Sequence, residues 1–402
     1  MQRLGFGLAC VVVVGSGFFG GSWFAWGHSA PWEAAVRNDS LGPAPAAASL
    51  EETFPVFWEA WRVVDEEFFG GPVSATDLTR GAIRGALATL GDPHTAFVPP
   101  SHRTLLDENL TGSFEGIGAA VELNERGELV ILDVLPGAPS ARAGIRAGDL
   151  VVEVDDESIV GLDIVAIVGR IRGPEGTPVT LTVHRSGVED PIRVDILRER
   201  VQLITAEHEL VSPGIGYLSI KEFNARAPEA VAAAIRALEA SALDGLVLDL
   251  RDNPGGLVTS VREVGSQFIG EGLLFTQAGR GDEDREYLSS GDGLATEIPI
   301  VVLMNGGSAS GSEILAGALR DHRRGILIGT QTFGKGSVQE LRELSDGSGL
   351  RVTVAHWFTP DGLGIQGEGL TPDIEVRVTD TELAAGLDPQ LALAIDYLQD
   401  LA

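Results

Sequence analysis

The second half of the chain alternates apolar runs with stretches of helical periodicity, and this alternation restricts the fold more than any other feature. Four short, largely apolar runs are expected to be strands buried on both faces of a sheet: residues 216–220, 245–250, 298–304 and 325–329. Stretches with apolar residues at helical spacing alternate with them: residues 227–240, 257–269 and 312–320. Strands that alternate with helices predict an α/β fold with a parallel-rich sheet and covering helices. Further strands at 350–358 and 374–378 and a helix at 389–401 complete this part.

The first half of the chain has a different pattern. Residues 53–69 and 76–90 carry apolar residues at helical spacing and predict two amphipathic helices in an N-terminal helical region. From residue 112 to about residue 186, glycines interrupt short alternating apolar runs, which is typical of a small inserted β domain. Its expected elements are short: strands at 119–123, 129–134, 150–154 and 179–184, and helices at 139–143 and 162–172.

The N-terminus carries a long apolar segment. Arg3 is followed by an uncharged run over residues 4–26, which is long enough to cross a bilayer as a helix. A cut after Ala30 would leave His28 where a small residue is preferred, so a signal anchor is favoured over a cleaved signal peptide. Residues 31–50 are predicted to be a linker. We therefore expect the remainder to be exported, in a periplasmic location, and tethered to the inner membrane.

Charge and cysteine content restrict the function further. The formal net charge of −29 argues against a nucleic-acid partner, because phosphate binding needs a basic surface. The single cysteine, Cys10, lies inside the apolar N-terminal run. The folded part can therefore form no intrachain disulfide and offers no cysteine-based metal site.

Two residues in the second half indicate a nucleophilic hydrolase. Of the 29 basic residues only Lys221 and Lys335 are lysines, and a desolvated lysine amine, unlike a guanidinium, can lose its proton near neutral pH and act as a base. Ser310 lies 25 residues before Lys335, a separation that one helix and one strand would span. Loops that follow parallel strands open at one edge of the sheet. Ser310 and Lys335 can therefore face each other as nucleophile and general base.

The surrounding residues supply candidate donors for a developing oxyanion. Ser310 precedes a predicted helix, whose first N–H groups carry partial positive charge, so the N–H of Gly311 is one natural donor. The second donor would be Gly255 or Gly256, where the lack of a side chain permits close approach. Gln339, four residues after Lys335, either holds the lysine amine in place or faces solvent from a strand.

The inserted domain resembles a PDZ domain. The resemblance rests on its length, its element order and three motifs: SFEGIG at 113–118, SARAGI at 140–145 and GD at 148–149. In PDZ domains a glycine-containing loop offers backbone N–H groups to the terminal carboxylate of a peptide, which adds a strand to the sheet. The resemblance implies that five residues of the first motif bind substrate: Phe114, Glu115, Gly116, Ile117 and Gly118. Arg172 is a regulatory candidate that could couple this domain to the catalytic one, although a solvated surface arginine is the favoured interpretation.

The order of motifs along the chain resembles the carboxyl-terminal processing peptidases. The motifs that carry this resemblance follow the PDZ-like domain: DLRDNPGG at 249–256, NGGSASGSE at 305–313, GKGSVQ at 334–339, TPDG at 359–362 and GIQG at 364–367. Matched by motif, Ser310 is the nucleophile, Lys335 the general base and Gln339 the partner that orients the lysine. Gly256 and Gly311 match the oxyanion donors, although the family usually has alanine after the nucleophile.

The resemblance also implies a domain plan and a set of partners. The plan has six parts: a signal anchor or signal peptide at 1–30, a linker at 31–50, a helical region at 51–111, a PDZ domain at 112–190, a serine/lysine peptidase core at 191–380 and a C-terminal helix at 381–402. Such a protein cleaves exported proteins near their C-termini and binds those C-termini through its PDZ domain. Neither a metal nor another cofactor is expected, and a homo-oligomer is left open.

Three other interpretations compete with this one. Ser310 could pair with a histidine, either His322 or His356, and with Asp252. Residues 329–335 copy most of a phosphate loop, but a glycine stands where the loop would need a hydroxyl to hold magnesium. A non-catalytic scaffold would keep the peptide groove, but it would not need both Ser310 and Lys335.

Overall fold

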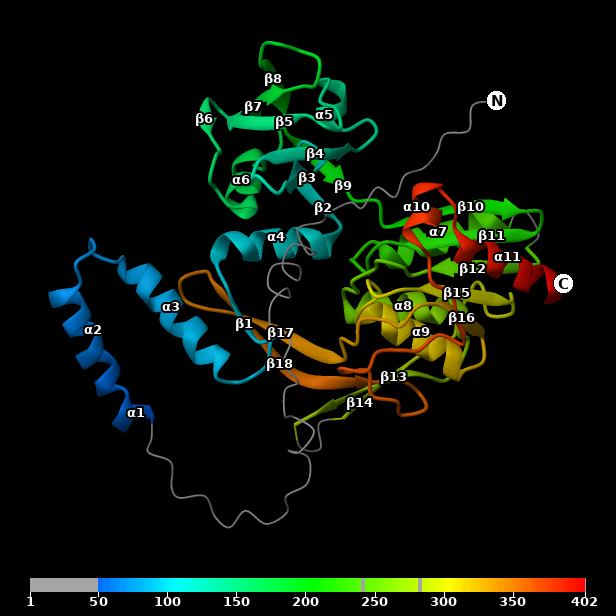
Figure 1. Cartoon of the computed structure of the whole chain (residues 1–402). Coiled ribbons are helices and arrows are strands. Elements are labelled where there is room, and N and C mark those ends of the chain that lie inside the picture. The colour runs from blue at the N-terminus through cyan, green and yellow to red at the C-terminus, as the bar shows by residue number, and fades with distance from the viewer. Residues whose placement is uncertain (1–49, 240–242, 281–283, 402) are drawn as a thin grey trace. The chain divides into compact units, whose positions relative to one another are not determined.

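The computed structural model of this protein describes residues 50–239, 243–280 and 284–401 (Figure 1). The described residues fall into two units, residues 50–93 and residues 94–401. Within these ranges no helix is long and apolar enough to cross a membrane. The predicted membrane segment, and all but the last residue of the predicted linker, lie outside the described residues.

The first unit consists of three helices, α1 (Leu50–Thr53), α2 (Pro55–Glu67) and α3 (Ala75–Ala88). Both predicted amphipathic helices are confirmed. Ser74 fixes the start of α3, because its side chain accepts a hydrogen bond from the N–H of Asp77 at 3.0 Å. Neither α2 nor α3 buries a side chain among the described residues.

The inserted domain, residues 113–202, is built around a six-stranded antiparallel sheet. The strand order is β3–β4–β5–β7–β8, and β6 pairs with β5. The bounds of six elements agree closely with the predicted ones: β3 (Ala119–Leu123), β4 (Leu129–Val134), α5 (Pro139–Arg142), β5 (Leu150–Val154), α6 (Ile164–Ile171) and β7 (Pro178–His184). Two further strands, β6 (Glu157–Ser158) and β8 (Ile192–Leu197), were not predicted from the sequence. Alternate residues of these strands form an apolar core, in which Ile131, Leu181 and Val183 are fully buried.

A two-stranded ribbon joins the inserted domain to the rest of its unit. β2 (Ser113–Gly116) enters the domain, β9 (Glu199–Gln202) leaves it, and the two strands pair antiparallel. At the base of the ribbon the N–H of Leu203 donates to the carbonyl of Gly112 at 3.0 Å. Gly112 ends α4 (Pro100–Thr111) in the left-handed conformation, with φ 76°, which favours glycine.

The central sheet has the order β10–β11–β12–β15–β16–β19, and all neighbours after the first pair are parallel. Its strands are β10 (Ala206–Ser212), β11 (Ile215–Ile220), β12 (Gly245–Asp249), β15 (Ile300–Met304), β16 (Gly325–Gly329) and β19 (Ile374–Glu375). Every residue of β12 and β15 is buried, as the continuous apolar runs predict. The predicted parallel-rich α/β sheet is confirmed.

Helices cover both faces of this sheet. One face packs against α7 (Ala227–Glu239), α8 (Val258–Phe268) and α9 (Gly311–Asp321). The other face packs against α11 (Pro389–Leu401), which follows the short α10 (Asp380–Ala384).

A second, antiparallel sheet was not expected from the sequence, which predicted a strand at 350–358 and a strand-like stretch around Gln339. It has the order β1–β18–β13–β14, with β17 also paired to β18. Its strands come from distant parts of the chain: β1 (Ala96–Val98), β13 (Leu273–Gly279), β14 (Arg285–Leu288), β17 (Ser337–Glu343) and β18 (Gly349–Phe358). Three of its aromatic side chains, those of Phe275, Tyr287 and Trp357, pack on one another. Much of the rest is polar and exposed, so these strands lack the apolar runs that mark the central sheet.

Candidate active site

The parallel sheet brings three loops to one edge, because β12, β15 and β16 are adjacent and run in the same direction. They are the loops that leave the carboxyl ends of these strands: residues 250–257, 305–310 and 330–336. Hydrogen bonds join them. The hydroxyl of Ser308 donates to the carbonyl of Leu250 at 2.8 Å, and the N–H of Phe333 donates to the carbonyl of Ser308 at 3.0 Å. The three loops therefore form one hydrogen-bonded cluster.

Ser310 stands at the turn from its loop into α9 in an unusual backbone conformation. Its φ is 53° and its ψ is −109°, outside the regions that L-residues normally occupy. The loop is fixed on its other side, where the N–H of Ala309 donates to the carbonyl of Asn253 at 3.0 Å. Non-glycine residues with such dihedrals occur mainly at functional sites, where the surrounding structure enforces them. Ser310 is half-buried, so its side chain is not sealed from solvent.

The side-chain amine of Lys335 loses its proton more readily than that of an ordinary lysine. Its pKa falls from the ordinary value of 10.5 to about 8. The main cause is burial, which disfavours the charged ammonium form, and the positive charge of Arg351 acts in the same direction. The carboxylate of Glu313 opposes both effects. With a pKa of about 8, about a tenth of the amine is neutral at pH 7.

One buried carboxylate connects Ser310 and Lys335. Oε2 of Glu313, in the first turn of α9, accepts the N–H of Ser310 at 2.8 Å and that of Lys335 at 2.9 Å. Oε1 accepts the N–H of Gly334 at 2.7 Å and the hydroxyl of Thr332 at 2.5 Å. Burial raises the pKa of Glu313, whereas its four donors favour the charged form. Because they share one oxygen atom, the backbone nitrogens of Ser310 and Lys335 lie within two hydrogen-bond lengths of each other.

Glu313 is a site residue that the sequence pattern alone does not single out. It stands three residues after Ser310, which is the position from which a glutamate caps the start of a helix. That spacing is the signal that could have found it.

The glycines after Asn253 are arranged to present N–H groups near Ser310. In the loop of residues 252–257, here called the oxyanion loop after the role expected from the sequence, the N–H of Gly255 is already taken by Oδ1 of Asn253 at 2.9 Å. Among the described residues, neither Gly256 nor Gly311 donates its N–H to any acceptor. A Cβ on Gly255 would lie 2.8 Å from the Cβ of Ser310, so the two loops touch. Of the two glycines that the sequence left open, Gly256 is the one with a free donor.

Gly311 has a structural reason to differ from the alanine that is usual in the resembling family. A Cβ on Gly311 would lie 2.7 Å from Cγ2 of Val261 in α8, closer than such atoms approach in proteins. The valine therefore occupies the space that an alanine methyl would need.

Gln339 lies on β17, and its side-chain amide donates to two hydroxyls. The acceptors are Oγ of Ser337 at 2.7 Å and Oγ1 of Thr353 at 3.4 Å. These contacts fix the side chain of Gln339 on β17, the strand that begins two residues after Lys335.

The first motif of the inserted domain offers free N–H groups. Its carbonyls are engaged, because Ser140 donates its N–H to the oxygen of Ile117 at 2.9 Å and its hydroxyl to that of Gly118 at 3.0 Å. In the described part of the chain, the N–H groups of Ile117 and Gly118 have no acceptor. Phe114, Glu115 and Gly116 belong instead to the ribbon strand β2. Two N–H groups without acceptors suit the binding of a carboxylate.

Arg172 follows α6 and is mostly buried, with 15% of its side chain exposed. It forms an ion pair with Glu108 of α4, and its guanidinium lies 4.4 Å from the ring centroid of Phe114. Burial lowers its pKa. The favoured interpretation of a solvated surface arginine is therefore wrong, and Arg172 links the inserted domain to α4.

The histidines that could have completed a triad are engaged elsewhere. His322 follows the opposite end of α9, with Nε2 2.6 Å from the carbonyl of Leu273. His356 is exposed on β18, opposite Ser337 of β17. In the part of the chain that the structure describes, neither histidine is hydrogen-bonded to Ser310.

Two further kinds of site are not formed. A strand, not a helix, follows Lys335, so residues 329–335 do not form a phosphate loop. Over residues 50–401, the undescribed gaps aside, there is no cluster of three or more side chains suited to hold a metal.

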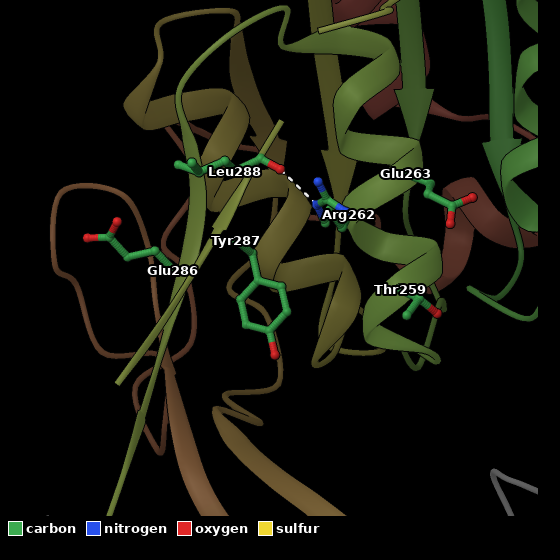
Figure 2. Close-up of a pocket in the computed structure, with 6 residues that line it drawn as sticks. All are labelled: Thr259, Arg262, Glu263, Glu286, Tyr287 and Leu288. Carbon is green, nitrogen blue, oxygen red and sulfur yellow. Dashed lines mark hydrogen bonds between the residues drawn. The ribbon is translucent and has the colours of Figure 1, made fainter. Parts of the chain in front are cut away.

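A surface hollow of about 370 Å³ lies between α8 and β14 (Figure 2). Its lining mixes charged, polar and apolar side chains: Thr259, Arg262, Glu263, Glu286, Tyr287 and Leu288. Nε of Arg262 donates to the carbonyl of Leu288 at 2.8 Å and so ties the helix to the strand. None of the predicted site residues lines this hollow.

Comparison with known proteins identifies the class. The model of peptidase family S41 matches residues 214–376, and the model of the PDZ domain matches residues 130–185. A crystal structure assigned to an S41 protease from Bacteroides fragilis has a TM-score of 0.54 and 16% identity, and the match covers 91% of this chain and 100% of that one. At that identity the likeness shows the fold.

Closer relatives define the family. The carboxy-terminal-processing protease of Bartonella bacilliformis is 39% identical over 320 residues, which are 78% of this chain and 73% of the relative. The carboxyl-terminal-processing protease of Synechocystis is 33% identical over 383 residues, 89% of this chain and 90% of the relative. The chain therefore belongs to the carboxy-terminal-processing proteases of peptidase family S41.

A Glu313→Gln variant should lose at least about tenfold in kcat. The amide keeps the size of the carboxyl group, but its NH₂ cannot accept, so donors to one of the two oxygens are left unpaired in a buried site. The loops of Ser310 and Lys335 then lose their common anchor. Steady-state kinetics with a peptide substrate measure the effect. Glu340→Gln on β17, where the side chain is 45% exposed, is the control and should keep the rate. Equal kcat for Glu313→Gln and the parent would contradict this role.

Proposed function

We propose that this chain is an exported serine endopeptidase that cleaves protein substrates near their C-termini. Ser310 is the nucleophile and Lys335 the general base. The observation that carries the assignment is the shared Oε2 of Glu313, which holds the backbones of these two residues together. The depressed pKa of Lys335, about 8, supports the same roles, because the neutral amine is the form that accepts a proton.

The reaction follows from these positions. The neutral amine of Lys335 takes the proton of the Ser310 hydroxyl while Oγ forms a bond to the scissile carbonyl carbon. The carbonyl oxygen becomes an oxyanion, which accepts hydrogen bonds from the N–H groups of Gly256 and Gly311. Lys335 then gives its proton to the leaving amine as the C–N bond breaks. Water, deprotonated by the same amine, hydrolyses the acyl-enzyme ester, and Gln339 orients the lysine side chain.

The inserted domain selects the substrate in this proposal. The free N–H groups of Ile117 and Gly118 bind the C-terminal carboxylate of the substrate, whose last residues add to the edge of β3. Arg172, with Glu108 and Phe114, makes a buried connection between this domain and α4 and is the candidate regulatory contact. The apolar run at residues 4–26 would place the protein outside the cytoplasm and attached to the inner membrane.

Lys335→Arg should abolish peptide hydrolysis although it keeps the positive charge, because a guanidinium does not give up its proton near neutral pH. Ser310→Ala should be equally inactive. Incubation with an unfolded protein, followed by mass spectrometry of the cleaved ends, measures both activity and position. Cuts near the C-terminus that vanish in both variants support the proposal, and full activity of Lys335→Arg would remove the lysine from the mechanism.

The rate should rise with pH through the pKa of Lys335, about 8. Below that value the amine is mostly protonated, so kcat should fall about tenfold for each pH unit. Above it, nearly all of the amine is neutral and the profile should level off. Initial rates from about pH 6 to about pH 9, with stability checked at each pH, measure the profile. A flat profile over this range would exclude a titrating base of this kind.

Recognition of the C-terminus can be tested with two peptides that differ in one group. A substrate with a free C-terminal carboxylate should have a KM at least about tenfold below that of the same peptide with a C-terminal amide, because a neutral amide loses the charge-assisted hydrogen bonds. Steady-state kinetics on the parent protein give both constants. Equal KM values for the two peptides would count against the loop at Ile117 and Gly118 as the carboxylate site.

A further inference from the structure

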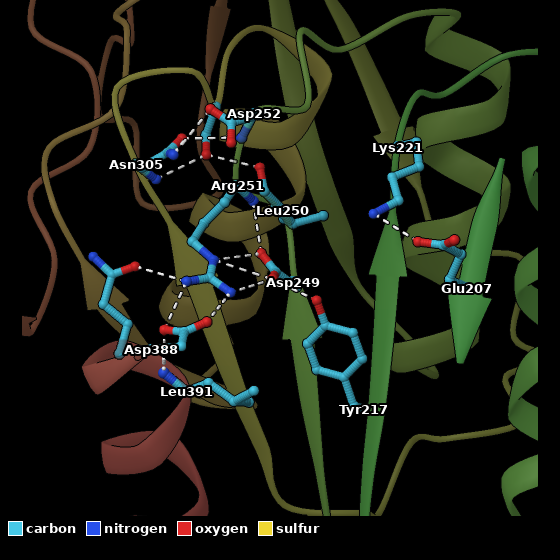
Figure 3. A network of polar contacts seen from close by, with 12 residues as sticks. Glu207, Tyr217, Lys221, Asp249, Leu250, Arg251, Asp252, Asn305, Asp388 and Leu391 are labelled. Carbon is cyan, nitrogen blue, oxygen red and sulfur yellow. Dashed lines mark hydrogen bonds and ion pairs between the residues drawn. The ribbon is translucent and has the colours of Figure 1, made fainter. Parts of the chain in front are cut away.

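Arg251, the residue directly before the oxyanion loop, lies between two carboxylates on the α11 side of the sheet (Figure 3). Its Nη2 is 2.6 Å from Oδ2 of Asp249, at the end of β12, and 2.8 Å from Oδ2 of Asp388. The hydroxyl of Tyr217 also donates to Asp249, at 2.7 Å. Burial, the largest cause, and the negative charge of Asp249 raise the pKa of Tyr217, so its hydroxyl stays protonated as a donor.

The contacts continue through the start of α11. Oδ1 of Asp388 accepts the N–H of Leu391 at 3.0 Å and so caps the helix. The buried Gln390 accepts a hydrogen bond from Nη1 of Arg251 at 3.0 Å and donates to the carbonyl of Val376 at 2.7 Å. Val376 follows β19. The chain of polar contacts through Asp249, Arg251, Asp388 and Gln390, here called the belt, therefore joins the end of β12 to the end of β19.

The proposed catalytic residues lie in the loops that follow the two strands between the ends of the belt. Asp249 of β12 pairs with Leu303 of β15, which pairs with Ile328 of β16, and Ile328 pairs with Ile374 of β19. Ser310 follows β15 and Lys335 follows β16. The belt therefore fixes β12 and β19, the outer strands of this group of four, and so supports the loops that follow the strands between them.

The oxyanion loop needs such support at Asp252, a non-glycine residue whose φ of 58° is unfavourable by itself. Gly255 and Gly256 have φ values of 100° and 146°, which glycine adopts readily. Asn305 holds Asp252 from the side of β15 with two hydrogen bonds, both 3.0 Å long. Arg251 is the corresponding anchor on the side of α11.

We propose that Arg251 is a positioning residue, and that the belt through Asp388 sets the place of the Gly256 N–H relative to Ser310. The C-terminal helix thereby supports catalysis although it contributes no group that touches substrate. This inference rests on the proposed serine mechanism, because the N–H of Gly256 matters only if an oxyanion forms there.

Asp388→Asn in the full chain is the first test. Its side chain is 35% exposed, so the variant leaves no fully buried charge unpaired. We expect kcat to fall at least about fivefold with KM unchanged, and the rate at which a fluorophosphonate labels Ser310 to fall by a similar factor. The midpoint of the pH profile should stay near that of the parent, since the charges that shift the pKa of Lys335 are those of Arg351 and Glu313. A kcat within about twofold of the parent would overturn the proposal.

Arg251→Lys is the second variant, and it keeps the charge while losing the two-pronged contact with both carboxylates. It should lower kcat and the labelling rate in the same way, with KM and the pH midpoint again unchanged. If one of the two variants does not fold, kcat and the labelling rate of the other variant decide the test. A variant that lowers only the melting temperature, with kcat retained, would show that the belt is purely structural and so contradict the proposal.

Glu207→Gln is the matched control. It removes an ion pair between Glu207 of β10 and Lys221, which directly follows β11; the charged atoms are 2.8 Å apart and the side chains 52% and 46% exposed. All rates should equal those of the parent. Failure of the proposed function would look different, because the parent itself would then neither cleave peptides nor react with the fluorophosphonate at Ser310.

Discussion

The arrangement at the sheet edge depends on the buried carboxylate of Glu313. A carboxylate without solvent is costly, and here the cost is offset by four hydrogen bonds and by its place at the positive end of a helix. The donors belong to two separate loops: Ser310 to one, and Thr332, Gly334 and Lys335 to the other. Because the acceptors are atoms of a single group, the two loops cannot separate without leaving donors unpaired.

The loops themselves hold conformations that isolated peptides would avoid. Ser310 and Asp252 have positive φ values, and each is pinned by a neighbouring side chain, Glu313 in one case and Asn305 in the other. The parallel sheet makes this possible, since it supplies a rigid edge from which several loops can be bound to one another. Geometry at the site is therefore a product of contacts between loops rather than of any one loop.

Sequence patterns predicted the central sheet because its strands are buried on both faces and so are apolar throughout. They missed most of the antiparallel sheet, where β14 and β17 expose polar residues. At the active site, too, features with a local sequence pattern were predicted and features that depend on distant contacts were not. Ser310 and Lys335 stand in motifs that can be recognised locally, whereas Glu313 acts largely through partners on another loop. Which glycine keeps a free N–H was likewise decided by a side-chain atom, Oδ1 of Asn253, whose direction no pattern reveals.

The ribbon of β2 and β9 has a consequence for how such chains are assembled. The chain leaves for the inserted domain at Gly112 and returns at Leu203, and these residues are hydrogen-bonded neighbours. No strand of the central sheet is interrupted by the excursion. A short turn could replace residues 113–202 without altering the register of any strand pair in the central sheet. The inserted domain is thus joined covalently to its unit only through this ribbon, and the buried ion pair of Arg172 with Glu108 of α4 is a second, noncovalent connection.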